Sequence, residues 1–210
     1  MVLLIGCAFA NVVRAQSIMQ FESPIVGVPN FSVEEDGFIL SSPKAAQFVN
    51  GGGLAFRNPG PGLLNLNGLN TVPYNGSQYA VPFTASEPIL REKNGLPFRL
   101  YGFDLAEYSA SVAVPHTVSV KGYFSAGGMI TTLLNLDGRI EGQPSDWQSF
   151  TFNEAWSGLD RVVLFATTSP FSGVGFSIDN VAVAAIPEPS GLLLVGVLTL
   201  AGMMWRRGSR

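Results

Sequence analysis

The chain has 210 residues, of which 47% are hydrophobic and 13% are charged, with 24 glycines and 14 prolines. This composition predicts one ordinary folded domain rich in turns, flanked by terminal segments, and excludes a highly charged disordered chain. Fourteen of the 15 acidic residues lie between residues 16 and 186, whereas Arg14 and three C-terminal arginines lie outside that body. An acidic body without a basic patch argues against nucleic acid as a partner.

The first fifteen residues have the features of a secretory signal peptide. An apolar run from residue 2 to residue 10 precedes Val13-Arg14-Ala15, which predicts export by the secretion machinery and cleavage between Ala15 and Gln16. The only cysteine, Cys7, lies in this segment, so the body has no disulfide, zinc cluster or cysteine nucleophile. Leu4-Ile5-Gly6-Cys7 also fits a lipobox, in which Cys7 would be lipidated; the alternative is that Cys7 is a small apolar residue of the signal.

Residues 16–185 form the predicted body, in which short apolar or alternating runs are separated by turn sequences such as Asn75-Gly76 and Asp137-Gly138. Ten runs are expected to be strands, namely Ile18–Glu22, Phe38–Leu40, Leu54–Arg57, Gln78–Phe83, Phe98–Leu105, His116–Phe124, Met129–Asp137, Trp147–Phe152, Arg161–Thr167 and Gly175–Val183. Strands without crossover helices favour an all-β fold, an antiparallel jelly-roll-like β-sandwich. The expected core is Phe103, Val118, Val120, Leu134, Phe150, Phe152, Val162, Leu164, Phe176 and Ile178.

The body offers little catalytic machinery. His116 is the only histidine and no Gly-x-Ser-x-Gly elbow accompanies it, which disfavours a serine hydrolase. The densest acidic run is Glu34-Glu35-Asp36, which is either a solvated turn or part of a carboxylate pair of the kind used in glycoside hydrolysis. We therefore predict no catalytic residue, with a hydrolase using acidic residues as the alternative.

The C-terminal segment, residues 186–210, has three parts. Pro187-Glu188-Pro189 is expected to be extended, because proline does not fit a helix interior. The apolar run 191–205 predicts a single transmembrane helix, although its fifteen residues span about 22 Å as a helix, less than the roughly 30 Å of a bilayer core. Trp205 suits the membrane interface, and the basic end at residues 206–210 places the C-terminus inside, with membrane orientation assigned to Trp205, Arg206, Arg207 and Arg210.

This order of Pro-Glu-Pro, short apolar helix and arginine-rich end resembles the PEP-CTERM sorting signal of Gram-negative bacteria that make extracellular polysaccharide, also labelled an ice-binding protein C-terminal domain. The resemblance implies a sorting motif at Pro187, Glu188 and Pro189. It also implies processing by an exosortase-type membrane enzyme and transient anchoring in the inner membrane, with release of the body to the cell surface or the extracellular matrix. The alternative is an ordinary single-helix membrane anchor.

The body contains four blocks that resemble the body common among PEP-CTERM proteins and are similar to jelly-roll carbohydrate-binding modules: Phe98–Leu105, Val118–Tyr123, Trp147–Phe150 and Phe176–Val181. That similarity implies a structural calcium ion at Glu22, Asp179 and Asn180, if the first and last strands are neighbours. The alternative is that Asp179 and Asn180 mark a bulge and satisfy buried polar groups. Trp156 is the preferred candidate for stacking on a glycan.

Together these features predict an exported cell-surface or matrix protein whose body is a non-catalytic structural, adhesive or glycan-binding module. Extracellular polysaccharide is its expected partner. A secreted carbohydrate-active hydrolase and a plain membrane-anchored domain are the alternatives.

Overall fold

The structure, a computed structural model, describes residues 15–22, 32–42, 54–64, 71–82, 87–108, 110, 117–166 and 176–187. Within these ranges the regular structure is β strand with short 3₁₀ turns, and every strand pair is antiparallel. The strands are β1 Ser17–Met19, β2 Ser32–Glu35, β3 Phe38–Ser41, β4 Leu54–Arg57, β5 Tyr79–Pro82, β6 Ile89–Glu92, β7 Phe98–Glu107, β8 Thr117–Phe124, β9 Met129–Asn135, β10 Gln148–Thr151, β11 Leu159–Ala166 and β12 Phe176–Ala185. The 3₁₀ turns are η3 Pro144–Asp146 and η4 Glu154–Trp156.

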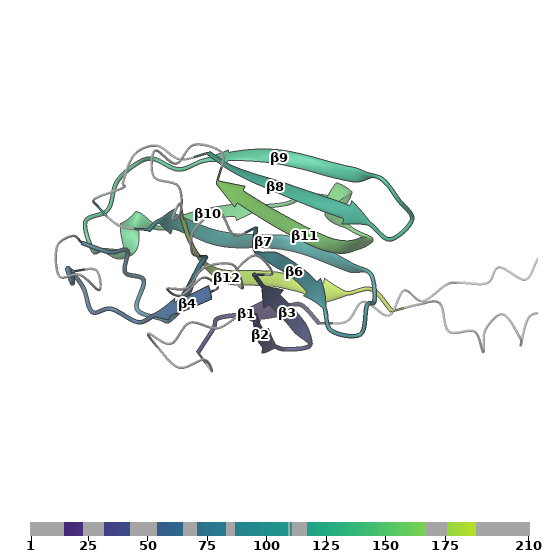
Figure 1. Ribbon diagram of the computed structural model, residues 1–210, viewed down its shortest axis with the longest axis horizontal. Helices are drawn as coiled ribbons and strands as arrows, with labels where there is room; N and C mark the ends of the chain where they lie inside the picture. The colour runs from purple at the N-terminus through teal and green to yellow at the C-terminus, as the bar shows by residue number, and fades with distance from the viewer. Residues whose placement is uncertain are drawn as a thin grey trace, which may run out of the picture.

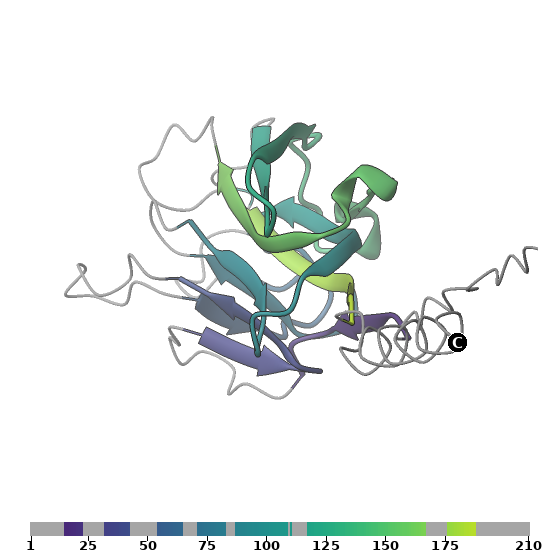
Figure 2. The same ribbon diagram turned by 90° about the vertical axis from the view of Figure 1, so that its right-hand side faces the viewer.

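The strands form an all-β, barrel-like sandwich (Figures 1 and 2). One layer runs β9-β8-β11-β6-β3-β2, and the other runs β10-β7-β12-β5-β4, with β1 also paired to β12. The layers join where Leu159 of β11 pairs with Phe98 of β7. In Figure 2 the green strands from the middle of the chain lie at the top and the purple and blue strands from its first part lie at the bottom.

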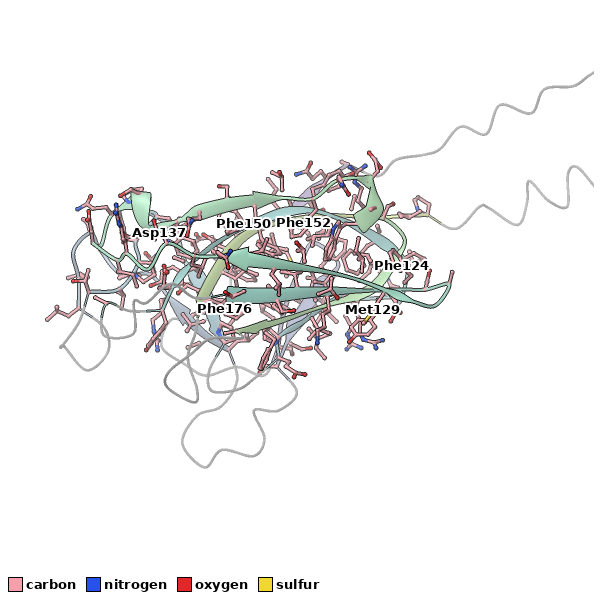
Figure 3. The ribbon with its side chains drawn as sticks, turned by 90° about the horizontal axis from the view of Figure 1, so that it is seen from above. Phe124, Met129, Asp137, Phe150, Phe152 and Phe176 are labelled. Atoms are coloured by element: carbon pink, nitrogen blue, oxygen red, sulfur yellow. The ribbon has the colours of Figure 1, made fainter. Side chains whose placement is uncertain are left out.

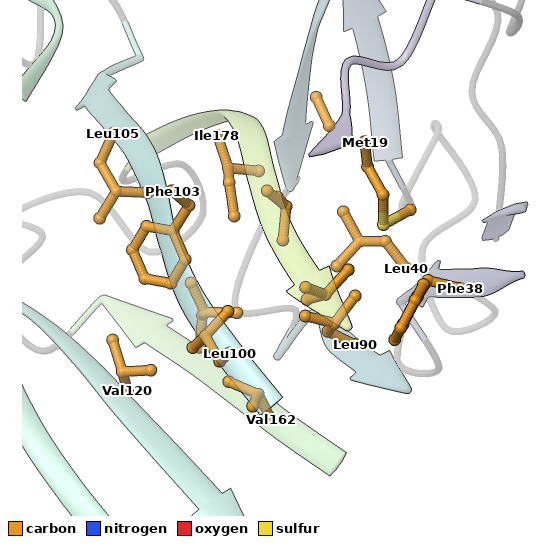
Figure 4. Packing of buried hydrophobic residues seen from close by; sticks show 14 of the residues in the cluster. Met19, Phe38, Leu40, Leu90, Leu100, Phe103, Leu105, Val120, Val162 and Ile178 are labelled. Carbon is orange, nitrogen blue, oxygen red and sulfur yellow. The ribbon is translucent and has the colours of Figure 1, made fainter. Parts of the chain in front are cut away.

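The core lies between these layers because alternate side chains of each strand point inward. On β7, Phe103 and Leu105 point inward, and so does Leu100, because the β7–β12 register shifts between the pairs Gly102–Ala182 and Leu100–Val183. These residues meet Val120 of β8 and Ile178 of β12 in one apolar cluster (Figure 4). Burying one such side chain contributes about 1.5–3 kcal/mol, so the sum over many strands holds the body together without covalent cross-links.

All ten predicted strands are confirmed, with ends shifted by a few residues. Eight of the ten predicted core residues are buried, while Leu134 and Phe150 are half-buried at the edge of the core. The sequence prediction missed β2 and β6 because both are short and carry charged residues. Glu92 of β6 is nevertheless buried, since its carboxylate accepts hydrogen bonds from the backbone of Asn94 and Leu96.

The acidic run of residues 34–36 lies on the β2–β3 hairpin. Glu35 accepts hydrogen bonds from the backbone N–H groups of Gln20 (3.1 Å) and Phe21 (2.9 Å), while Glu34 forms an exposed ion pair with Lys93 (2.6 Å). Asp36 and Gly37 make the turn with positive φ angles of 51° and 81°. These acids therefore serve structural contacts, and Glu35 ties the segment after β1 to the hairpin.

In the part of the chain that the structure describes, no helix has the length and apolar character needed to cross a membrane. The predicted transmembrane helix at 191–205 lies outside the described residues, as do Glu188, Pro189, Trp205, Arg206, Arg207 and Arg210. His116 and the signal segment before Ala15 also lie outside them.

Candidate functional site

A cluster of polar side chains lies on the outer face of the sheet where β10, β7 and β12 run side by side (Figure 1). Asp104 of β7 pairs in register with Ser149 of β10 on one side and with Asp179 of β12 on the other. Its carboxylate accepts hydrogen bonds from Ser149 Oγ (2.5 Å) and Asn180 Nδ2 (2.7 Å). Side chains from the two flanking strands, β10 and β12, therefore converge on one carboxylate of β7.

Asn180 reaches Asp104 because β12 bulges at this point. The β7–β12 register shifts between the pairs Asp179–Asp104 and Ala182–Gly102, which leaves one extra residue on β12. Asn180 takes up that bulge with φ of 50°, a conformation that asparagine tolerates better than most residues. Its own N–H donates to Asp179 Oδ1 at 2.7 Å, which stabilises the bulge.

Asp179 lies across from Asp104 on β12 and is fully buried. The loop before β5 covers it, since Asn75 Nδ2 (2.6 Å) and Ser77 Oγ (2.8 Å) both donate to Asp179 Oδ2. The loop itself is an Asx-type turn, in which Ser77 N–H donates to Asn75 Oδ1 and Gly76 has φ of 90°.

Burial raises the pKa of Asp179 to about 6. The hydrogen bonds from Ser77, from the backbone of Asn180 and from Asn75 oppose this rise, and the neighbouring Asp104 adds to it. Burial thus disfavours the charged form of Asp179, and the hydrogen-bond donors around its carboxyl group offset part of that cost.

A hollow of about 210 Å³ opens beside the cluster. Its polar lining comes from Gln16, Asp104, Ser149, Thr151 and Asn180, which reach it from the start of the body and from three strands. The aromatic and small residues that complete the lining are Tyr101, Gly102, Phe103, Phe150 and Ala182.

Gly102 sets the base of this hollow. A Cβ at this position would lie 2.5 Å from the carbonyl oxygen of Phe150, far inside contact distance, so only glycine allows β10 to approach β7 this closely. Phe150 lies on β10, two residues before Phe152 (Figure 3). Gly102 pairs across to Ala182 of β12, so two small residues leave room against the sheet.

Tyr101 is half-buried at the side of the hollow. The guanidinium of Arg99 lies over its ring, 4.4 Å from the centroid, and forms an ion pair with Glu154 of η4 at 2.5 Å. One ring face of Tyr101 is therefore covered by a cation that is itself held in place.

The first condition for the predicted calcium site is confirmed, because β1 and β12 are paired through Met19 and Val181. Two of the three predicted ligands, Glu22 and Asp179, already accept hydrogen bonds from protein donors. Glu22 is exposed and accepts a hydrogen bond from the backbone of Gln78 (3.0 Å), whereas both oxygens of Asp179 accept from protein donors. Among the described residues, no group of three His, Cys, Asp or Glu side chains is placed to hold a metal ion.

The bulge and the hydrogen bonds that the alternative interpretation predicted at Asp179 and Asn180 are present, and calcium binding at these residues stays a prediction. Asp104, Ser149, Asn75 and Ser77 were not predicted. Asp104 lies in a strand that also carries Arg99 and Glu107, and its partners Ser149 and Asn180 are 45 and 76 residues away in sequence, so no local pattern singled it out.

The prediction that Trp156 stacks on a glycan is wrong, because stacking requires an exposed ring and this ring is buried. Trp156 is 5% exposed and packs on Phe152 with ring centroids 4.6 Å apart. It also lies close to Gly122, where an added Cβ would be 3.1 Å from Trp156 Cζ3. The 3₁₀ turn η4, which Asn153 caps by accepting from Ala155 N–H, turns the indole into the core while Glu154 remains outside.

The two predicted processing positions that the structure describes lie at the ends of the body. Ala15 and Gln16 are exposed just before β1, and Gln16 also lines the hollow. Pro187 is half-buried two residues after β12.

No protein-family model matches the chain, and no curated protein is similar enough to count as a relative.

Proposed function

We propose that this protein is an exported surface or matrix protein whose C-terminal Pro-Glu-Pro segment directs an exosortase-type membrane enzyme to release its body. The observation that carries the proposal is the short distance between body and motif. Ile186 N–H donates to the carbonyl oxygen of Pro97 (2.7 Å), so among the described residues the last backbone hydrogen bond of the sandwich is made by the residue directly before Pro187. Cleavage at or after Pro187 would release a complete body, since β12 ends at Ala185.

The body is proposed to be a non-catalytic, jelly-roll-like module with a structural, adhesive or glycan-binding role. The pairing of its first and last strands, β1 and β12, supports the jelly-roll-like arrangement. Its exposed polar hollow offers one carboxylate, Asp104, with both oxygens already held by Ser149 and Asn180.

A hydrolase is the second candidate, and one observation favours it. Asp179 lies across from Asp104 and its pKa is raised to about 6, a value suited to a general acid. Asp179 does not line the hollow, however, and Asn75 and Ser77 cover it. Among the described residues, a substrate in the hollow would therefore meet one carboxylate, whereas glycoside hydrolysis uses two.

Mass spectrometry of the protein recovered from the surface of an exosortase-containing Gram-negative host tests the sorting proposal. The expected mature chain begins at Gln16 and ends near the Pro-Glu-Pro motif. Replacing the motif by Pro187→Ala, Glu188→Ala and Pro189→Ala should leave the tail attached, whereas Glu141→Ala, at an exposed glutamate of the body, should not. A surface protein that still ends at Arg210 would refute sorting and favour the plain membrane anchor.

A further inference from the structure

We propose that the hollow between β10, β7 and β12 binds one neutral sugar unit, an inference that rests on the proposed surface role of the body. The hollow is bounded by Gln16, Tyr101, Asp104, Thr151 and Asn180 over a floor of small residues. Three properties of the hollow support this ligand class. Its hydrogen-bonding groups are held in place, its floor of small residues leaves room for one ring, and its negative charge disfavours anions.

The hydrogen-bonding groups are fixed before any ligand arrives. Ser149 and Asn180 each donate to a different oxygen of Asp104, so the plane of this carboxylate is set. Each carboxylate oxygen can accept a second hydrogen bond, and two neighbouring sugar hydroxyl groups can donate to one carboxylate together. Asn180 uses its amide nitrogen on Asp104, which leaves its amide oxygen as an acceptor.

The shape suits a single ring with both polar and apolar faces. Gly102 and Ala182 form a low floor, and the volume of about 210 Å³ is smaller than the roughly 300–1,000 Å³ of sites for drug-sized ligands. Tyr101 and Phe150 add apolar surface at the sides for the C–H face of a ring. Because Arg99 covers one face of Tyr101, the tyrosine is also held in position.

The charge of the lining selects against acidic sugars and phosphates. No Lys, Arg or His occurs among the described residues that line the hollow, whereas Asp104 does. Arg99 is nearby, but its guanidinium is engaged with Tyr101 and Glu154. A neutral sugar therefore avoids the repulsion that a uronic acid or a phosphate would meet at Asp104.

The test is an NMR titration of the full chain in phosphocholine micelles, a detergent without a sugar headgroup. The probes are the methyl glycosides of glucose, galactose, mannose and N-acetylglucosamine, with methyl glucuronide as the acidic comparison. At least one neutral glycoside should shift the backbone amides of Tyr101, Asp104 and Thr151 with a dissociation constant in the millimolar range, and the glucuronide should bind more weakly. No shift at these amides with any neutral glycoside, or tighter binding of the glucuronide, overturns the proposal.

Two variants and one control locate the binding. Asp104→Asn should weaken binding about tenfold or more, because hydrogen bonds to a charged acceptor are lost. Asp160→Asn makes the same chemical change on β11, outside the hollow, and should have no effect. If Asp104→Asn disturbs the fold, Thr151→Trp, at an exposed side chain, should fill the hollow and abolish binding. Equal affinities for the wild type and both hollow variants would overturn the site.

The outcome of this titration is independent of the sorting test. Failure to bind any glycoside would leave the processing of the C-terminus unaffected. Conversely, an intact C-terminus ending at Arg210 would refute sorting but would not change the result of the titration.

Discussion

At the scale of single residues, the outer face of β7 and β12 combines a buried acid with a close backbone approach. Asp179 keeps its carboxyl group away from water among hydrogen-bond donors from the loop before β5 and from its own bulge. Gly102 lets β10 lie against β7 beside it. Each residue leads to a measurable consequence for stability.

Asp179 should make the folded protein less stable as pH rises from about 4 to about 6. Its pKa is about 6 in the folded state, above the ordinary value of an aspartate, so the folded chain binds more protons than the unfolded chain in this window. The stabilisation is present below pH 4 and is lost as pH rises through 6, by up to about 3 kcal/mol.

Urea unfolding of the wild type and Asp179→Asn at pH 4, 5, 6 and 7 measures this effect. The variant loses hydrogen-bond acceptors and is expected to be less stable at low pH, but its free energy of unfolding should lack the contribution from titration of Asp179. Parallel pH profiles for the two proteins would contradict the assignment.

Gly102→Ala should destabilise the body by about 1–3 kcal/mol, the usual cost of overpacking. The new Cβ would meet the carbonyl oxygen of Phe150 at 2.5 Å, and that oxygen belongs to the backbone. Gly60→Ala is the matched control, because its Cβ would meet only the side chain of Leu63 at an ordinary 3.4 Å. Thermal unfolding should show a lower Tm for the first variant alone, and equal Tm values would contradict the close approach.

At the scale of elements, β7 and β9 show that the position of a strand in the sheet decides how far its apolar side chains are buried. β7 has β11, β10 and β12 as partners and is buried along most of its length. β9 pairs with β8 alone among the described strands, and its exposed residues include Met129 and Leu133, 62% and 61% exposed. The two strands are both apolar but differ in what covers them.

Leu105→Ala on β7 should cost about 2–5 kcal/mol, the range for truncating a buried leucine. Leu133→Ala on β9 should cost less than about 1 kcal/mol, because most of its side chain already faces water. Chemical denaturation of both variants compares the two directly. A similar loss in each would mean that β9 is covered in the folded protein.

At the scale of the whole molecule, one apolar cluster draws residues from both layers. It includes Phe38 and Leu90 of one layer and Leu100 and Val183 of the other, and Phe38 packs edge-on against Phe98 at 5.6 Å between centroids. Both layers therefore share one hydrophobic interior.

The body should accordingly unfold in a single cooperative transition. Far-UV circular dichroism reports the strands, and tryptophan fluorescence reports the surroundings of Trp147 and Trp156. The two signals should give the same midpoint in urea. Two separate midpoints would show that the layers unfold independently, which a shared core does not allow.

The sequence by itself determined the local features of this protein. Alternating apolar residues and glycine-rich turns were enough to predict ten strands and the all-β class, because side-chain alternation is a property of each strand alone. The order of the C-terminal segments is likewise visible without a structure, and it is the basis of the resemblance to a sorting signal.

Only the tertiary structure decided which distant residues meet. The contact of Asp104 with Ser149 and Asn180 depends on the register of three strands and on a bulge, and no local pattern encodes either. Trp156 followed a loop-like sequence, yet packing against Phe152 buried it. The sequence predicted the strands because each strand has its own local pattern. The hollow could not be predicted, because burial and strand pairing depend on the whole chain.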